Sequence, residues 1–154
     1  MTQIFSPMLR RFNRVIDNVQ RLYHEMALSA GLSDSCFQTM YMLCETGGCR
    51  QKDISDVSSL PKQTIHSAVK QLMANECITA EKGRGRDVML YLTEKGRRLA
   101  RETVEDIIRC ENAALAAMGE QDQAELIRLH EEYYHLLEKT YQQSKEKSDA
   151  HSTI

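Results

Sequence analysis

The chain has 154 residues, of which 42% are apolar and 27% charged, a composition that suits one globular domain with a single core. It contains no run of about 18 apolar residues and no secretory signal pattern, so we expect a cytoplasmic protein without a membrane span. Its five cysteines are odd in number and scattered, which favours reduced thiols over a disulfide framework.

The charge is unevenly distributed along the chain, although the formal net charge is only −2. Residues 50–101 hold eleven basic and six acidic side chains, a net of +5. Residues 1–49 are balanced, and residues 102–154 have a net charge of −7, so the three segments sum to −2. A basic central segment in an acidic chain is typical of a module that meets phosphate groups.

Apolar residues at steps of three and four predict two helices in the first third of the chain. The first covers residues 8–30, and Gly31 can end it by adopting the left-handed conformation. The second follows Ser33, whose hydroxyl can cap its first turn, and it ends at Gly47 and Gly48.

The basic segment predicts a helix-turn-helix. A short helix over residues 50–57 is followed by a break at residues 58–61 and by a second helix that begins around Pro61. In this second helix Ile65, Ala68, Val69 and Leu72 point inward, while the polar residues fall on the other side. Two short helices joined by a tight turn form this motif.

The period of the pattern then changes to two, which predicts strands over residues 78–82 and 88–93. Between the strands, Gly83 and Gly85 allow a tight hairpin tip, and Arg84 and Arg86 make that tip cationic. Such a hairpin after a helix-turn-helix is a wing.

Two more helices are predicted after the wing, over residues 94–118 and 122–144, and Thr93 can cap the first of them. The polar segment 145–154 is predicted to be a disordered tail. The fold class is therefore mainly α with a small β-hairpin wing. We predict a single domain, residues 1–154, in which residues 33–93 form the winged helix-turn-helix lobe and helices 8–30 and 94–144 mediate dimerisation.

This order of elements predicts binding to double-stranded DNA, because a helix fits the major groove and can present side chains to base edges. Gln63 and His66 are expected to contact bases, whereas lysines suit phosphate, which positions a protein without specifying sequence. Arginines at a wing tip can reach the minor groove or the backbone. The residues expected to contact DNA are Lys62, Gln63, Thr64, His66, Ser67, Lys70, Arg84, Arg86, Arg50 and Lys52.

With these elements the sequence resembles the MarR family of bacterial transcription regulators, from about residue 8 to residue 147. The most specific stretches are Leu60-Pro61-Lys62-Gln63-Thr64-Ile65 and Leu92-Thr93-Glu94-Lys95-Gly96. Arg86 occupies the place of the family's wing arginine. The chain departs from the family at Arg84, where an aspartate is usual, at Glu76, where a glycine is common, and at Ser67, where many members carry arginine.

The resemblance implies a triangular homodimer in which the first helix and the last two helices intertwine. The residues favour the same conclusion, since helices 94–118 and 122–144 carry more apolar positions than a small winged domain could cover. A two-fold dimer predicts a pseudo-palindromic operator with half-sites roughly 34 Å apart. Repression is the expected mode of regulation.

The resemblance also implies release from DNA by a small effector, often aromatic or acidic, held between the dimer helices and the DNA-binding lobe. The candidate residues for such a pocket are Tyr23, His24, Tyr41 and Arg14, with Arg10 as an alternative to Arg14.

Two other hypotheses stay open. A redox switch could use Cys49, which is predicted at a helix start where the dipole lowers a thiol pKa, or Cys36 and Cys44 on the second helix. A winged helix can also serve protein–protein contact alone. Glu131 and His135 could share a helix face, but no metal motif accompanies them, and no cofactor is expected. The chain lacks the glycine loops and nucleophile motifs of enzymes, so no catalytic activity is predicted.

Overall fold

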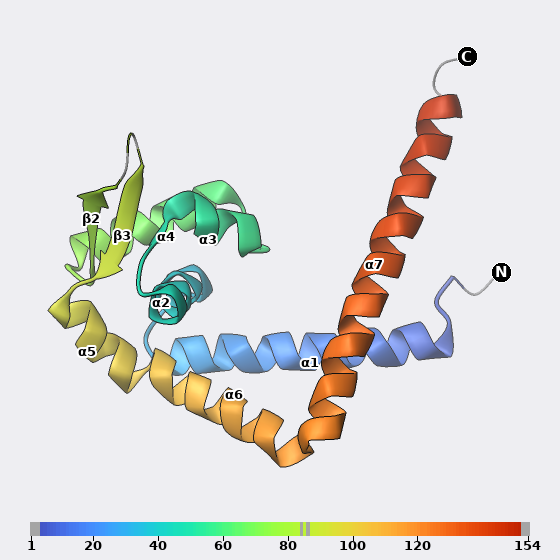
Figure 1. Ribbon diagram of the computed structural model, residues 1–154, viewed down its shortest axis with the longest axis horizontal. Helices are drawn as coiled ribbons and strands as arrows, with labels where there is room; N and C mark the ends of the chain where they lie inside the picture. Colours follow the sequence, from blue (N-terminus) through green and yellow to red (C-terminus); the bar gives the residue numbers. More distant parts are fainter. Residues whose placement is uncertain (1–3, 84, 86, 152–154) are drawn as a thin grey trace. The chain divides into compact units, whose positions relative to one another are not determined.

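The computed structural model describes residues 4–83, 85 and 87–151, with side chains as far as Lys147. The chain divides into two units, Met1–Ile108 and Arg109–Ile154. Its elements in order are α1 (Pro7–Ser29), α2 (Asp34–Thr46), β1 (Cys49–Arg50), α3 (Gln51–Val57), α4 (Lys62–Ala74), β2 (Ile78–Lys82), β3 (Val88–Leu92), α5 (Glu94–Glu102), α6 (Val104–Met118) and α7 (Glu120–His151) (Figure 1). The mainly α fold with a small winged hairpin is thereby confirmed.

The first two helices begin and end where local sequence dictates. The hydroxyl of Ser33 accepts a hydrogen bond from the backbone N–H of Cys36 at 3.3 Å and so caps α2. Gly31 and Gly47 adopt φ values of +69° and +71° after α1 and α2, in the left-handed region that only glycine enters freely. These caps confirm the predicted helix ends.

The sheet has three antiparallel strands in the order β1-β3-β2. The predicted hairpin β2–β3 is present, and Ala80 on β2 pairs with Leu90 on β3. Strand β1 was not predicted, because two residues are too few to show a period. It pairs Cys49 with Leu90 and Arg50 with Met89, and so joins the wing to the start of α3.

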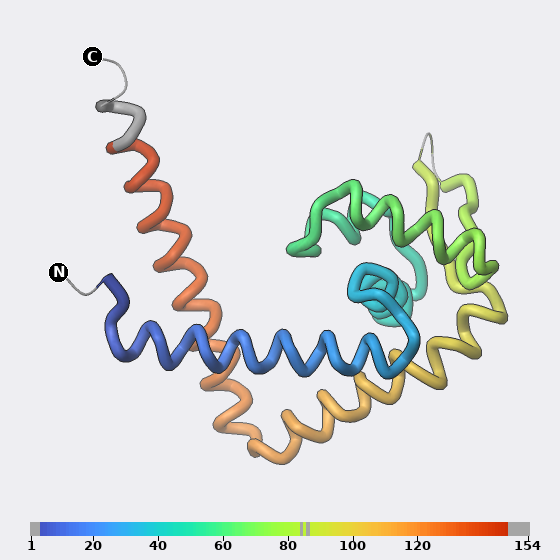
Figure 2. The backbone as a smooth tube through the Cα atoms, turned by 180° about the vertical axis from the view of Figure 1, so that it is seen from behind, coloured from blue at the N-terminus to red at the C-terminus, as the bar shows by residue number. Residues whose placement is uncertain are grey.

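Helix α2 lies at the centre of the first unit, where it contacts α1, α4, α5 and two strands. Figure 2 traces the chain from α2 through α3 and α4 to the wing hairpin. Met40 and Leu43 of α2 are buried, and Ile65 and Leu72 are buried from the side of α4. Thr39, a buried polar residue, donates its hydroxyl to the carbonyl of Ser35 at 2.8 Å, so its burial leaves no unsatisfied donor.

The helix predicted over residues 94–118 is interrupted, which corrects the sequence prediction. Thr103 has φ −135° and ψ −75°, and α5 ends before it while α6 begins after it. Its hydroxyl donates to the carbonyl of Leu99 at 2.6 Å. Thr is β-branched and competes for backbone carbonyls, and neither property shows in an apolar periodicity.

Helix α7 continues to His151, although a disordered tail was predicted from residue 145. Glu, Lys and Gln favour helix even where no core is available, and the ammonium of Lys145 lies 5.0 Å from the centre of the Tyr141 ring. Within the described residues, no helix is both long and apolar enough to cross a membrane.

Glu76 closes α4 in the position where a glycine is common, with φ +57°. The chain then turns into β2, and the Thr93 hydroxyl donates to the Glu76 carbonyl at 2.6 Å. Thr93 also accepts from the N–H of Gly96 at 3.0 Å and thereby caps α5, as predicted. The end of the wing is thus fastened to the end of α4.

Replacing Gly96 with alanine should destabilise the first unit by about 3 kcal/mol, because a Cβ there would overlap the backbone carbonyl of Cys77. Urea unfolding followed by circular dichroism measures the loss. Arg98→Ala is the matched control at an exposed position of α5 and should stay within about 0.5 kcal/mol of wild type. An unchanged midpoint for Gly96→Ala would contradict this packing.

Candidate nucleic-acid interface

Helices α3 and α4 form a helix-turn-helix held from behind by α2. Ile54 of α3 and Ile65 of α4 are fully buried. In the turn, the Leu60 N–H donates to the Ser58 hydroxyl at 2.9 Å, and that hydroxyl donates to the Gln38 side chain of α2 at 3.2 Å. At the start of α4, the carbonyl of Pro61 accepts hydrogen bonds from the N–H groups of Thr64 and Ile65. The orientation of α4 is therefore fixed by its neighbours.

The outer side of α4 exposes polar side chains, as the sequence predicted. Lys62, Gln63, Ser67 and Lys70 are exposed, while Thr64 is half-buried. The Ser67 hydroxyl donates to the Gln63 carbonyl one turn back at 3.0 Å, so it retains lone pairs to accept with. A buried back and a short polar front are what a helix needs in order to enter the major groove.

His66 is half-buried and joins the two helices of the motif. Its Nδ1 lies 3.3 Å from Oε1 of Gln51 at the start of α3. An amide oxygen only accepts, so this contact favours the tautomer that carries its proton on Nδ1. Gln51 was not among the residues singled out from the sequence, because nothing in the spacing brings it to His66.

Lys52 and Arg50, both predicted to contact phosphate, differ in the structure. Lys52 is exposed on α3. Arg50 instead occupies the N-cap position of α3, where its backbone N–H donates to the Asp53 carboxylate, and its guanidinium faces two carboxylates: Nη2 lies 2.6 Å from Asp53 Oδ1, and Nη1 lies 3.5 Å from Asp87 Oδ2. Asp53 sits three residues after the cap, a spacing that could have pointed to it. Asp87 is distant in sequence and gave no signal.

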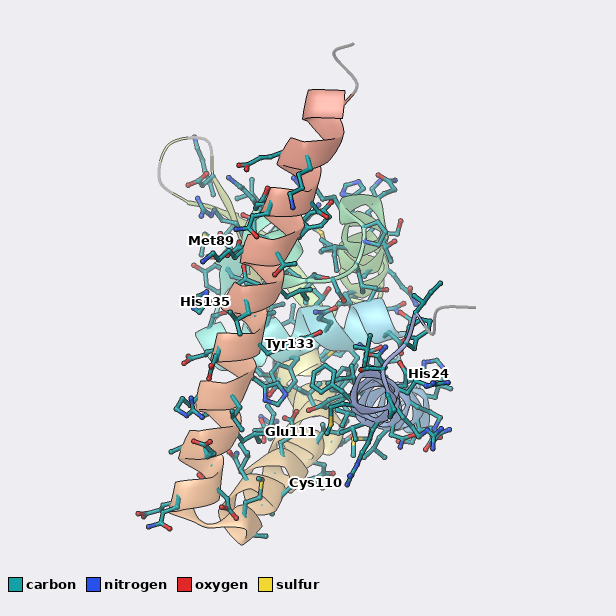
Figure 3. The ribbon with its side chains drawn as sticks, turned by 90° about the vertical axis from the view of Figure 1, so that its right-hand side faces the viewer. His24, Met89, Cys110, Glu111, Tyr133 and His135 are labelled. Atoms are coloured by element: carbon teal, nitrogen blue, oxygen red, sulfur yellow. The ribbon has the colours of Figure 1, made fainter. Side chains whose placement is uncertain are left out.

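The wing is a two-stranded hairpin, and a backbone hydrogen bond closes the base of its tip. The Gly83 N–H donates to the Asp87 carbonyl at 2.8 Å. The side chain of Met89, labelled in Figure 3, lies so close to Gly83 that a Cβ there would be 3.1 Å from Met89 Cγ. Arg84 and Arg86 lie outside the described residues.

A cavity of about 480 Å³ lies between α2, β3, α5 and the first turns of α6. Its apolar lining comes from Leu43, Leu92, Ala100 and Ile108, and its charged lining from Arg97, Arg101 and Glu105. Arg97 donates Nη1 to the Leu92 carbonyl at 2.8 Å and Nε to Glu94 at 3.1 Å. Arg101 lies 3.6 Å from Glu94. The lining thus combines apolar side chains with two arginines that are both paired with Glu94 and with one further carboxylate, Glu105.

The four residues predicted to line an effector pocket do not border this cavity. His24, labelled in Figure 3, places Nδ1 2.9 Å from the Asp34 carboxylate and so links α1 to α2. Tyr41 packs against Phe37, with ring centres 6.0 Å apart. Tyr23 and Arg14 are exposed on α1, as is Arg10. None of the residues that line the cavity was predicted to bind an effector, because three helices and a strand contribute to it.

Two of the thiols, those of Cys44 and Cys49, have environments that favour their protonated form. Burial raises the pKa of Cys49, and the nearby Asp53 raises it further against a lowering hydrogen bond from Thr46. The prediction that a helix dipole lowers the pKa of Cys49 is wrong, because the residue lies in β1 and is buried. Burial, then Glu105, also raises the pKa of Cys44. Cys36 is buried with its Sγ 3.5 Å from the Gln71 side chain.

Comparison with known proteins shows which family the sequence of this chain matches. The MarR family sequence model matches residues 30–87. No match was found among curated protein sequences. The matched segment runs from the end of α1 through α2, α3 and α4 to the base of the wing, so it covers most of the winged helix-turn-helix lobe.

Solved structures extend the likeness over the whole fold. A MarR family regulator from Neisseria meningitidis is 24% identical with a TM-score of 0.79, covering 90% of this chain and 99% of its own. NadR in complex with 4-hydroxyphenylacetate is 16% identical, with a TM-score of 0.67 and coverages of 86% and 95%. Staphylococcus aureus MarR in complex with salicylate and kanamycin is 21% identical, with a TM-score of 0.64 and coverages of 86% and 91%. The resemblance to the MarR family is thereby confirmed, in sequence for residues 30–87 and in fold for the chain.

Asp53 should make stability depend on pH in acid. Hydrogen bonds from the side chain and backbone of Arg50 lower the pKa of Asp53 to about 2. A carboxylate whose pKa is lowered by folding stabilises the protein above its unfolded pKa, and this contribution disappears as the pH falls towards the folded value. Asp53→Asn should therefore lower the urea midpoint at pH 6, and the difference from wild type should vanish between about pH 4 and pH 2.

The control for this series is Asp56→Asn, an exposed position on the same helix. It should track wild type at every pH. A gap between Asp53→Asn and wild type that persists unchanged at pH 2 would show that the ion pair is not its source.

Proposed function

We propose that this chain, which has the MarR fold and carries the MarR family pattern over residues 30–87, is a cytoplasmic, homodimeric regulator of transcription that binds double-stranded DNA. The single observation that carries this proposal is the outer side of α4. Four polar or cationic residues are exposed there, on a helix whose other side is buried against α2. The basic segment 50–101 provides the matching charge.

The proposed contacts divide by chemistry. Gln63 reads a base edge, as an amide can pair with adenine in the major groove, and His66 offers Nε2 to a second base. Lys62, Lys70 and Lys52 contact phosphate. Thr64 and Ser67 contact bases or phosphate from the same face of the helix. Arg84 and Arg86 of the wing tip are assigned to the minor groove or backbone from the sequence alone.

Dimerisation is supported by large apolar side chains that the single chain leaves exposed. On α1 these are Met8, Val15, Val19, Leu22 and Leu28, and on α7 they are Ile127, Leu129, Tyr134, Leu136, Leu137 and Tyr141. Contiguous exposed apolar surface marks a partner surface, and a second copy would bury it. A two-fold dimer would place two recognition helices on a pseudo-palindromic operator.

We further propose that the protein is a repressor released by a small organic acid. NadR and Staphylococcus aureus MarR were solved with 4-hydroxyphenylacetate and with salicylate, which are both small aromatic acids. The cavity beside Arg97 and Arg101 offers this chain's own place for such a molecule. A redox switch is less well supported, since burial raises the pKa of Cys44 and Cys49 and so lowers their reactivity.

The DNA-binding proposal is tested by fluorescence anisotropy with a labelled duplex of the sequence upstream of the gene. Binding should survive scrambled competitor and saturate at two chains per duplex. Lys70→Ala should weaken binding to every duplex and reduce the slope of log K against log salt by about 1. Gln63→Ala should cost about 1–3 kcal/mol on the operator and relax its specificity.

Arg98→Ala, an exposed substitution on α5, is the control and should bind as wild type does. Absence of binding even at low salt would contradict the proposal. It would leave a winged helix for protein–protein contact as the better reading of the fold.

The effector site is tested without DNA by titrating the ¹⁵N-labelled protein with 4-hydroxyphenylacetate and, as a neutral control, its amide. The acid should shift the backbone signals of Gly47, Leu92 and Ala100, which border the cavity. Arg97→Gln should weaken binding by about tenfold, the loss of one charge-assisted contact, whereas Arg98→Gln should not. Shifts confined to the surroundings of Tyr23 and Tyr41 would move the site to the residues predicted from the sequence.

A further inference from the structure

Arg50 belongs to two parts of the DNA-binding lobe at once. Its backbone pairs with Met89 in the sheet, and the next residue begins α3. Its N–H donates to Asp53 Oδ2 at 2.9 Å, and its Nε lies 3.1 and 3.0 Å from the two oxygens of the same carboxylate. With Nη2 also on Asp53, the guanidinium is held in a fixed orientation by the first turn of α3.

The remaining side of that guanidinium faces the wing. Nη1 donates to Asp87 Oδ2 at 3.5 Å. Asp87 is at the base of the wing tip, where its carbonyl also accepts from the N–H of Gly83. One arginine therefore connects a carboxylate of α3 with a carboxylate of the wing.

The contact between Arg50 and Asp87 lies beyond the last residue pair that joins β1 to β3. Strand β1 pairs with β3 only through Cys49 and Arg50, opposite Leu90 and Met89. Beyond Met89 the hairpin continues to Val88 and Asp87 without a β1 partner. The Arg50–Asp87 pair thus extends the attachment of the wing two residues past the end of the backbone ladder.

The charges around Arg50 argue against a phosphate contact. Two carboxylates surround one guanidinium, so the cluster has a net charge of −1. Its hydrogen bonds to Asp53 raise the pKa of Arg50 and lower that of Asp53, as expected for a tight pair. Lys52 is exposed in the first turn of α3, and its charge also acts to lower the pKa of Asp53.

We propose that Arg50 and Asp87 form a clamp that fixes the wing to the start of α3, so that Arg50 positions the wing for DNA rather than contacting phosphate. The clamp rests on the proposed DNA-binding function for its purpose. Whether the clamp exists does not depend on that function, because the attachment of the wing can be measured in the free protein.

The decisive variant is Asp87→Asn, for which the two readings predict opposite signs. If Arg50 contacts phosphate, removing a neighbouring negative charge strengthens DNA binding. If the clamp positions the wing, the same change weakens binding, by about two- to fivefold for a largely exposed pair, and leaves the salt slope unchanged because no phosphate contact is lost. Arg50→Gln should cause a similar loss, and the double variant should bind no worse than the weaker single variant.

Arg50→Lys separates charge from geometry. Lysine keeps the positive charge that a phosphate needs but lacks the fork that reaches two carboxylates. It should therefore bind DNA about as weakly as Arg50→Gln. Asp56→Asn removes a charge from an exposed position at the other end of α3 and should not weaken binding. A lysine variant that binds as wild type would overturn the clamp in favour of the phosphate contact.

Amide hydrogen exchange in the free protein provides the second readout. Asp87→Asn should speed exchange of the Gly83 N–H at the wing base by several-fold, with Ile54 and Leu72 in the core unchanged as the check on folding. Unchanged exchange at Gly83 overturns the clamp whatever the DNA results. Faster exchange together with unchanged or stronger DNA binding overturns the positioning role. If the wild-type protein binds no DNA, the proposed function fails and exchange at Gly83 still decides whether the clamp exists.

Discussion

The winged helix-turn-helix lobe depends on the packing of α4 against α2. Ile65, Val69 and Leu72 are buried on that side of α4, and burial of one such side chain contributes about 1.5–3 kcal/mol. The same packing leaves Gln63 and Lys70 in solvent. Because one side of α4 is buried in the core, the other side can be polar without cost to folding, and a rigid support presents the face that we propose to meet DNA.

The wing is attached to this support at both of its ends. At the far end of β3, Thr93 donates to the carbonyl of Glu76 and caps α5, and Gly96 packs against the Cys77 carbonyl. At the end near the tip, Asp87 meets Arg50. A hairpin of five-residue strands has little stability alone. Its position therefore follows from these contacts with α3, α4 and α5.

The cavity lies at the joint where the wing strand enters α5. Tyr91 and Leu92 of β3 border it, and so do Arg97 and Ala100 of α5 and Gly47 after α2. A molecule bound there would touch the elements that hold the wing, and this would couple the proposed effector site to the geometry of the proposed DNA-binding face. Coupling of this kind requires different affinities for two arrangements of those elements.

The sequence by itself determined the order of helices and strands, the caps at Ser33 and Thr93, and the polar side of α4, because each follows from residues a few positions apart. Tertiary structure decided the break at Thr103, the short strand β1 and the cavity beside Arg97. It also decided the surroundings of Arg50, which has the charge of a phosphate ligand but lies between Asp53 and Asp87. Periodicity reports which residues share a face of one element, whereas an ion pair or a cavity depends on side chains that the fold brings together from distant parts of the chain.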